Sequence, residues 1–185
     1  MKIKKIDSCY FIDTLFDFKK HKKVLLDLIS KMPDKDRKNN GEQISKTDWN
    51  VPKDYNREYL NYFYNIIQEH MYKMCDFLHT DKWIITNAWF QQYKNTDRHD
   101  WHTHTGCHFT SVFYLELPEK RYSTQIFNSF TKKIIKVNVK EGDILTFPSY
   151  LNHRSIVNNS NKRKTIISFN SNFDEAHQKL LMAKH

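Results

Sequence analysis

The pattern of the chain changes at about residue 80, and this change constrains the fold more than any other feature. Before it, apolar residues recur at steps of three and four over 24–32 and 60–78, the spacing of amphipathic helices. After it, short β-branched or aromatic runs alternate with turn sequences, which is typical of antiparallel strands. These runs are 83–93, 109–117, 123–127, 134–139, 143–147, 153–157 and 165–173. The sequence therefore predicts an α+β, mainly β protein, with helices packed on one sheet of an antiparallel barrel or sandwich.

The remaining segments give weaker patterns. Residues 9–16 suit an opening strand, and residues 33–55 are polar and are expected to form a long connection. The last dozen residues, from Asp174, are expected to form a short helical tail. We see no internal repeat and no linker, so residues 1–185 are expected to form one domain. Its parts would be helical support (1–80), a β core (81–173) and the tail (174–185).

Composition narrows the class of protein. With 39% hydrophobic and 15% aromatic residues, a packed globule is expected rather than disorder. The three cysteines are widely spaced without a CxxC, which argues against a disulfide framework and for a reducing compartment. No apolar run approaches the ~20 residues of a membrane span, so a cytoplasmic protein is expected. The formal charge of +9 would allow contact with nucleic acid, but the basic residues are dispersed, which favours a solvated face.

His102 and His104 are the strongest candidates for metal ligands. Alternate side chains of a strand share a face, so both imidazoles would point the same way, and His153 would come from a strand paired nearby. Three imidazoles with open coordination positions suit Fe(II), Zn, Cu or Ni. Cys107 and His108 offer a rival structural zinc site, but ligands this close together would strain a strand. The other histidines are expected on the surface, His70 on a helix and His21, His79 and His177 elsewhere.

A basic residue, Lys164, follows the third histidine, His153, eleven positions later in the sequence. Arg163 and Lys164 open the last apolar run, and only one of them can face the interior of a strand-built barrel. Ser168 and Asn170 share the parity of Lys164, which favours Lys164 as the inward residue. A buried cation needs a partner, and a bound dicarboxylate would supply one. The alternative is a basic turn in water.

These residues resemble the 2-oxoglutarate and Fe(II)-dependent oxygenase superfamily, and more closely its small prolyl-hydroxylase-like branch of bacterial and phage proteins. The resemblance spans 83–173 and rests on the order and spacing of four motifs. They are His102-Thr-His104, residues 111–115, residues 141–153 and residues 164–170. The resemblance implies a double-stranded β-helix (jelly-roll, cupin-like) with N-terminal helices on the major sheet. If the chain is phage-encoded, it would work in the host cytoplasm.

The resemblance also implies roles for individual residues. His102 and His153 match the two metal histidines, and His104 stands where most of the superfamily has Asp or Glu; Asp100 is an alternative carboxylate ligand. Lys164 matches the basic residue that binds the distal carboxylate of 2-oxoglutarate. Further cosubstrate-site candidates are Tyr114, Tyr93, Ser168 and, in place of Lys164, Arg163. Candidates for an apolar wall are Trp89, Trp101 and Phe147.

The implied activity is that of a dioxygenase using Fe(II) and 2-oxoglutarate. It would hydroxylate an unidentified substrate, with a peptidyl side chain favoured, while 2-oxoglutarate and O2 become succinate and CO2. Nucleic acid is less favoured as a substrate, because no aromatic pair is obviously placed to stack a flipped base. Two alternatives remain: a non-catalytic jelly-roll whose histidines are structural or hold zinc, and a three-histidine cupin enzyme that does not use 2-oxoglutarate.

Overall fold

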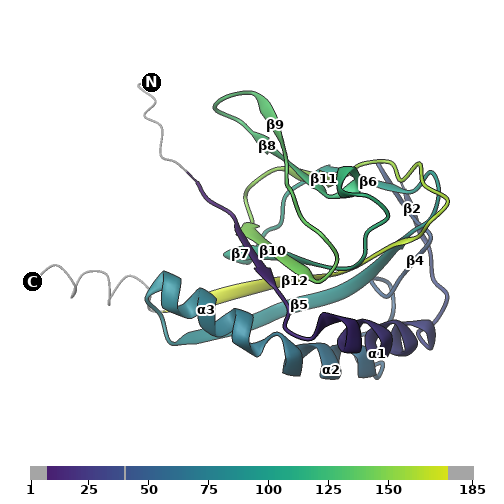
Figure 1. Cartoon of the computed structure of the whole chain (residues 1–185), viewed down its shortest axis with the longest axis horizontal. Helices are drawn as coiled ribbons and strands as arrows, with labels where there is room; N and C mark the ends of the chain where they lie inside the picture. Colours follow the sequence, from purple (N-terminus) through teal and green to yellow (C-terminus); the bar gives the residue numbers. More distant parts are fainter. Residues whose placement is uncertain (1–7, 40, 175–185) are drawn as a thin grey trace, which may run out of the picture.

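In the described part of the chain, two antiparallel six-stranded sheets face each other, and three helices cover the outer side of one of them (Figure 1). The computed structural model describes residues 8–39 and 41–174. The helices are α1 (Phe18–Ser30), α2 (Glu58–Ile66) and α3 (Gln68–Leu78). This arrangement confirms the predicted α+β, mainly β class and the double-stranded β-helix.

The major sheet runs in the order β1-β10-β7-β12-β5-β4. Its long central strands join distant parts of the chain, which brings the start and the end of the β region side by side. The strands are β1 (Phe11–Thr14), β10 (Asp143–Pro148), β7 (Phe109–Glu116), β12 (Lys164–Asp174), β5 (Lys82–Tyr93) and β4 (Lys46–Thr47).

The minor sheet runs in the order β2-β3-β6-β11-β8-β9. Its strands are β2 (Arg37–Asn39), β3 (Glu42–Ile44), β6 (Arg98–His102), β11 (His153–Ser155), β8 (Thr124–Asn128) and β9 (Lys133–Lys136). A short 3-10 helix, Lys120–Tyr122, precedes β8. Because β6 and β11 are neighbours, the residues around 102 and 153 meet in this sheet.

Two apolar cores separate these layers. One lies between the helices and the major sheet and contains Leu25 and Ile29 of α1, one turn apart, with Phe63 of α2 stacked on Phe113 of β7. The other lies between the two sheets and contains Tyr114, Leu145 and other buried side chains. The second core surrounds the histidines, so the candidate site lies inside the β-helix.

The prediction that residues 33–55 form a long connection is wrong. The segment contains β2, β3 and β4, which extend both sheets at their edges. These strands are only two or three residues long and are defined by backbone pairing rather than by a buried face. They are too short to show the alternation of apolar and polar residues from which strands are predicted. The helical stripe over 60–78 also divides at Ile67, which ends α2 and caps α3. The expected tail beyond Asp174 lies outside the described residues.

One tight turn fixes where α1 meets the major sheet. Gly142, before β10, has φ +90°, and its carbonyl accepts a hydrogen bond of 2.9 Å from the Leu15 N–H. A Cβ at this position would lie 2.7 Å from Cγ of Phe18, so both the conformation and the contact require glycine. Among the residues described, no helix is both long and apolar enough to cross a membrane.

Candidate metal centre

Three histidines from two strands and a loop converge on one point. One ligand nitrogen from each of His102, His104 and His153 lies within 4.8 Å of the others. His102 and His153 face each other directly in the β6–β11 pairing, and their ring centroids are 4.2 Å apart. His104 lies just beyond the end of β6, and its backbone N–H donates to the Ser149 carbonyl at 3.0 Å. We call these residues the histidine triad.

Backbone carbonyls set the tautomers of two members of this triad. His102 Nδ1 lies 2.7 Å from the Asp100 carbonyl, and His153 Nδ1 lies 2.9 Å from the Leu151 carbonyl. A carbonyl oxygen only accepts, so each Nδ1 carries the proton and each Nε2 keeps its lone pair. This arrangement leaves the two Nε2 atoms free to bind a metal, with ring orientations already fixed.

The triad is held in its neutral form. Burial lowers the pKa of all three imidazoles: that of His104 to about 4, that of His153 well below the usual value, and that of His102 below the usual value. Around neutral pH the three nitrogens therefore offer lone pairs rather than protons. Divalent transition metals bind such imidazoles, whereas protonated ones repel them.

Two of the three aromatic side chains expected in an apolar wall contact the triad. Trp89 stacks on His104 with ring centroids 5.7 Å apart, and the Phe147 ring meets His153 at 4.7 Å. The expectation for Trp101 is wrong, because its ring packs on Phe127 and lies under the Arg154 guanidinium, at 4.4 Å. The Trp89 indole nitrogen is buried and has no hydrogen-bond partner among the residues that the structure describes.

The structure does not bring the alternative ligands to the triad. In a regular strand Asp100 and His102 would share a face, but β6 carries an irregularity between positions 99 and 102. The Asp100 carboxylate is consequently exposed and lies 3.7 Å from Arg98. His108 turns to the far end of β12, where its Nδ1 accepts from the Phe173 N–H at 3.1 Å. Within the described ranges, the only cluster with metal-ligand spacing is the histidine triad.

The same irregularity brings in His99, which alternation along the strand does not predict. His99 and His102, three positions apart, stack face to face with ring centroids 3.8 Å apart and planes within 9°. Glu42, the cross-strand partner of His99 on β3, holds the His99 Nε2 at 2.9 Å. The Arg37 guanidinium in turn pairs with Glu42. The sequence signal that was available is the pair of histidines at i and i+3, which only a bulge places on one face.

Lys164 reaches the interior from β12. It is 1% exposed, and its ammonium donates to the Tyr122 carbonyl and to Ser155 Oγ, each at 2.8 Å. It also lies 5.2 Å from the centre of the Tyr93 ring. In the part of the chain that the structure describes, no carboxylate pairs with this ammonium. Burial alone lowers the pKa of Lys164 to about 7.

The remaining cosubstrate candidates divide between interior and surface. Tyr93 and Ser168 line a cavity of about 30 Å³ together with the triad. Tyr114 is buried, but its hydroxyl is engaged by Thr124, donating to Oγ1 at 2.7 Å and accepting from the N–H at 3.1 Å. Arg163, the alternative to Lys164, points outward and pairs with Glu116 at 2.7 Å. Arg163 immediately precedes β12, and residues next to each other in an extended segment face opposite sides, which separates Arg163 from Lys164.

The prediction that His70 lies on the surface of its helix is wrong. It is buried on α3, where its Nε2 lies 3.0 Å from Thr146 Oγ1 and its Nδ1 lies 3.3 Å from the Asp13 carboxylate. Asp13 and Thr146 belong to β1 and β10, which the helix covers. Burial lowers the pKa of His70, although Asp13 opposes this effect. His21 is also partly buried, with its Nδ1 2.8 Å from the Tyr62 hydroxyl.

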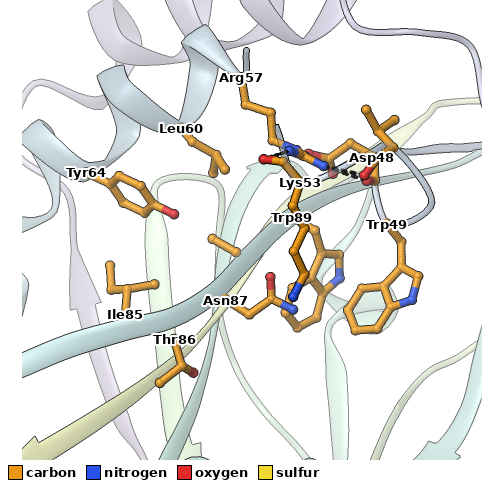
Figure 2. Close-up of a pocket in the computed structure, with 12 residues that line it drawn as sticks. Asp48, Trp49, Lys53, Arg57, Leu60, Tyr64, Ile85, Thr86, Asn87 and Trp89 are labelled. Atoms are coloured by element: carbon orange, nitrogen blue, oxygen red, sulfur yellow. Dashed lines mark hydrogen bonds and ion pairs between the residues drawn. The ribbon is translucent and has the colours of Figure 1, made fainter. Parts of the chain in front are cut away.

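A larger pocket of about 490 Å³ opens on the other side of Trp89 (Figure 2). Trp49 and Trp89 meet edge to face at 4.6 Å on one side of it, and Tyr64 and Ile85 lie on the other. The Asp48 carboxylate, beside the pocket, is held by Arg57 at 2.9 Å. Trp89 lines both this pocket and the triad cavity, so the two cavities are neighbours.

Comparison with solved structures identifies the fold. A viral collagen prolyl hydroxylase from Paramecium Bursaria Chlorella virus-1, in complex with 2-oxoglutarate, is 18% identical, with a TM-score of 0.56 over 88% of this chain and 94% of that one. A Pseudomonas putida prolyl-4-hydroxylase is 10% identical, with a TM-score of 0.62 over 89% and 91%. A prolyl hydroxylase from Trichoplax adhaerens, in complex with a hypoxia inducible factor peptide fragment, is 15% identical, with a TM-score of 0.63 over 92% and 86%.

At the level of sequence, no family model and no curated protein matches the chain. The identities to the solved structures are low, but the match extends over most of both chains in each case. The fold that the motif resemblance implies is therefore confirmed in three dimensions. This chain has the double-stranded β-helix fold of the 2-oxoglutarate and Fe(II)-dependent oxygenases, with prolyl hydroxylases among its structural neighbours.

Proposed function

We propose that this protein is an oxidoreductase that uses Fe(II) and 2-oxoglutarate to hydroxylate a C–H bond of its substrate. The observation that carries the proposal is that one nitrogen from each of three neutral imidazoles lies within 4.8 Å of the others, inside the β-helix. When bound, Fe(II) and 2-oxoglutarate supply the oxidising chemistry, in which O2 and the keto acid become succinate and CO2. The protein supplies ligands, orientation and shelter from water.

The triad suits a divalent metal that keeps open coordination positions. Three nitrogen ligands on one side of an ion leave the other positions for a chelating keto acid and for O2. A neutral imidazole replaces the carboxylate of the usual two-histidine, one-carboxylate set, so the bound ion would keep more of its positive charge. His104 would thus favour anionic ligands in the remaining positions.

Lys164 suits the distal carboxylate of a dicarboxylate. Its ammonium is buried against two neutral oxygens and the Tyr93 ring, so an incoming carboxylate would add the counter-charge that this position lacks. Ser155, which Lys164 contacts, is two residues from His153, and this places the cation near the triad. The cavity of about 30 Å³ is small, so the side chains that line it must move apart when the keto acid binds.

For the substrate, we propose a peptidyl side chain. The pocket of about 490 Å³ shares Trp89 with the triad cavity and is within the size range of ligand sites. Its aromatic and polar lining could hold a segment of chain while one side chain passes Trp89 toward His104. A neighbour with a bound peptide fragment has the same fold, which supports this choice by analogy.

The experiment is an anaerobic titration of the Fe(II)-loaded protein with 2-oxoglutarate, followed by visible absorption. We expect a weak metal-to-ligand charge-transfer band that His153→Ala abolishes. Metal binding without the band would favour a three-histidine metalloenzyme that does not use 2-oxoglutarate, and absence of metal binding would favour a structural protein. Succinate formation without substrate would then establish turnover. Incubation with peptide pools should yield products heavier by one oxygen atom, detected by mass spectrometry.

A further inference from the structure

The neighbours of His102 on the minor sheet form a connected chain that the proposed chemistry does not use. His102 is stacked against His99, His99 is bonded to Glu42, and Glu42 pairs with Arg37. These groups are all partly or largely buried: the exposed side-chain fractions are 16% for His99, 14% for Glu42 and 24% for Arg37. Burying charged groups costs free energy, so a chain of partly buried charges is expected to serve the structure or the function.

The contact between the two rings is the first step. Parallel imidazoles with centroids 3.8 Å apart are in full face contact, so the His99 ring blocks rotation of His102 on that side. The same ring is also held at its Nδ1, which donates a hydrogen bond to the Asp100 carbonyl. The His102 ring is therefore held by the hydrogen bond at Nδ1 and by the His99 ring stacked on its face. Together these contacts fix the direction of the His102 Nε2 lone pair.

Glu42 fixes His99 in turn. A carboxylate only accepts, so His99 Nε2 carries the proton that it donates across 2.9 Å. Glu42 is itself held by Arg37 and by the Asn39 amide, which donates at 2.6 Å. Three strands, β2, β3 and β6, thus contribute to the placement of one ring.

Charge is the second consequence of this chain. Without Glu42, the positive charge of the Arg37 guanidinium would have no counter-charge from Glu42 and would disfavour a divalent cation at the triad. With Glu42 in place, the two charges cancel locally, and the site keeps its affinity for a cation although the triad contains no carboxylate.

We infer that His99 and Glu42 are positioning residues for the metal centre: His99 orients His102 through face contact, and Glu42 fixes His99 and offsets the charge of Arg37. This inference rests on the proposed metal site. It assigns a purpose to the β2–β3 hairpin, which closes the minor sheet beside the triad. Outer partners of metal-binding histidines typically change metal affinity by about 10–100-fold when they are removed.

The test uses Co(II) as the probe, with its visible absorption reporting both affinity and coordination geometry. Relative to the unaltered protein, Glu42→Gln and His99→Ala should each weaken Co(II) binding about tenfold and alter the spectrum. His99→Phe keeps a flat ring against His102 and should restore the affinity to within about threefold. Adding Arg37→Gln to Glu42→Gln should recover most of the loss, because the unpaired cation is then gone.

The matched control is Glu116→Gln, which breaks a similar carboxylate–arginine pair at the surface, on the major sheet. It should leave both Co(II) affinity and spectrum unchanged, and thermal unfolding of every variant identifies general loss of structure. Unchanged Co(II) binding in Glu42→Gln and His99→Ala would overturn the inference alone. So would a Phe variant as weak as the Ala variant, since His99 would then act as a ligand. Failure of the unaltered chain to bind Co(II) would overturn the metal centre as well.

Discussion

Replacement of Lys164 by methionine separates cosubstrate binding from metal binding. Methionine has nearly the same length as lysine but no charge, so it keeps the packing and removes the ammonium. A hydrogen bond to a charged group contributes about 1.5–3 kcal/mol, so the variant should bind 2-oxoglutarate about 10–150-fold more weakly. Co(II) binding should be unchanged, because Lys164 contacts Ser155 and Tyr122 rather than the triad.

The same substitution should change the dependence on pH. The fall in the pKa of Lys164 from 10.5 to about 7 corresponds to about 5 kcal/mol of unfavourable burial of the charged form. Between these values the unfolded chain holds more protons than the folded one, so the stability of the free protein rises with pH over this window. A bound carboxylate favours the ammonium, so binding takes up a proton above about pH 7, and affinity falls as pH rises.

The assay is the anaerobic charge-transfer titration at about pH 6.5 and about pH 8.5, with calorimetry in two buffers to count protons taken up on binding. The unaltered protein should bind more weakly at the higher pH, and Lys164→Met should lose both affinity and pH dependence. Arg163→Met is the matched control, since that side chain is paired with Glu116 at the surface. Normal 2-oxoglutarate binding by Lys164→Met, or loss of that binding in Arg163→Met instead, would contradict the role of Lys164.

Three further predictions follow from particular contacts. His102→Ala should abolish Co(II) binding while Asp100→Ala changes it by less than about twofold, as seen by absorption titration; an equal loss in both would mean that the carboxylate enters the site. Acidification below about pH 6.5 should destabilise the metal-free protein, because the folded state, with the lowered pKa of His70, holds fewer protons than the unfolded chain. His70→Asn should flatten the slope of urea midpoint against pH, and an unchanged slope would contradict this account. Gly142→Ala should cost about 1–3 kcal/mol and more than Gly106→Ala, where a Cβ meets nothing within 4 Å; equal shifts in thermal midpoint would exclude the clash with α1.

The sequence predicts most of the fold because most of its elements bury one regular face. Leu25 and Ile29 mark α1 by helical spacing, and runs such as 109–117 mark strands that pair within one sheet. The inward position of Lys164 follows from the same regularity, since residues next to each other in an extended segment face opposite sides and Arg163 lies outside. Regular periodicity is thus sufficient to place this part of the candidate site.

The features that the sequence does not predict arise where regularity fails or where distant segments meet. The irregularity in β6 turns Asp100 outward and brings His99 onto His102, and no residue type in that stretch specifies it. His70 is buried because β1 and β10 supply Asp13 and Thr146 from far along the chain. The edge strands of residues 37–47 depend on backbone pairing with strands that the local sequence does not contain.

The direct pairing of His102 with His153 makes any bound ion a cross-link between β6 and β11. Since the unfolded chain does not hold the two rings together, binding adds to the free energy of unfolding in proportion to the logarithm of the metal concentration over its dissociation constant. Iron supply would then govern the lifetime of the protein as well as its turnover. In a cell short of iron, the metal-free molecules would be degraded by proteases first, because they unfold more often than the metal-bound ones.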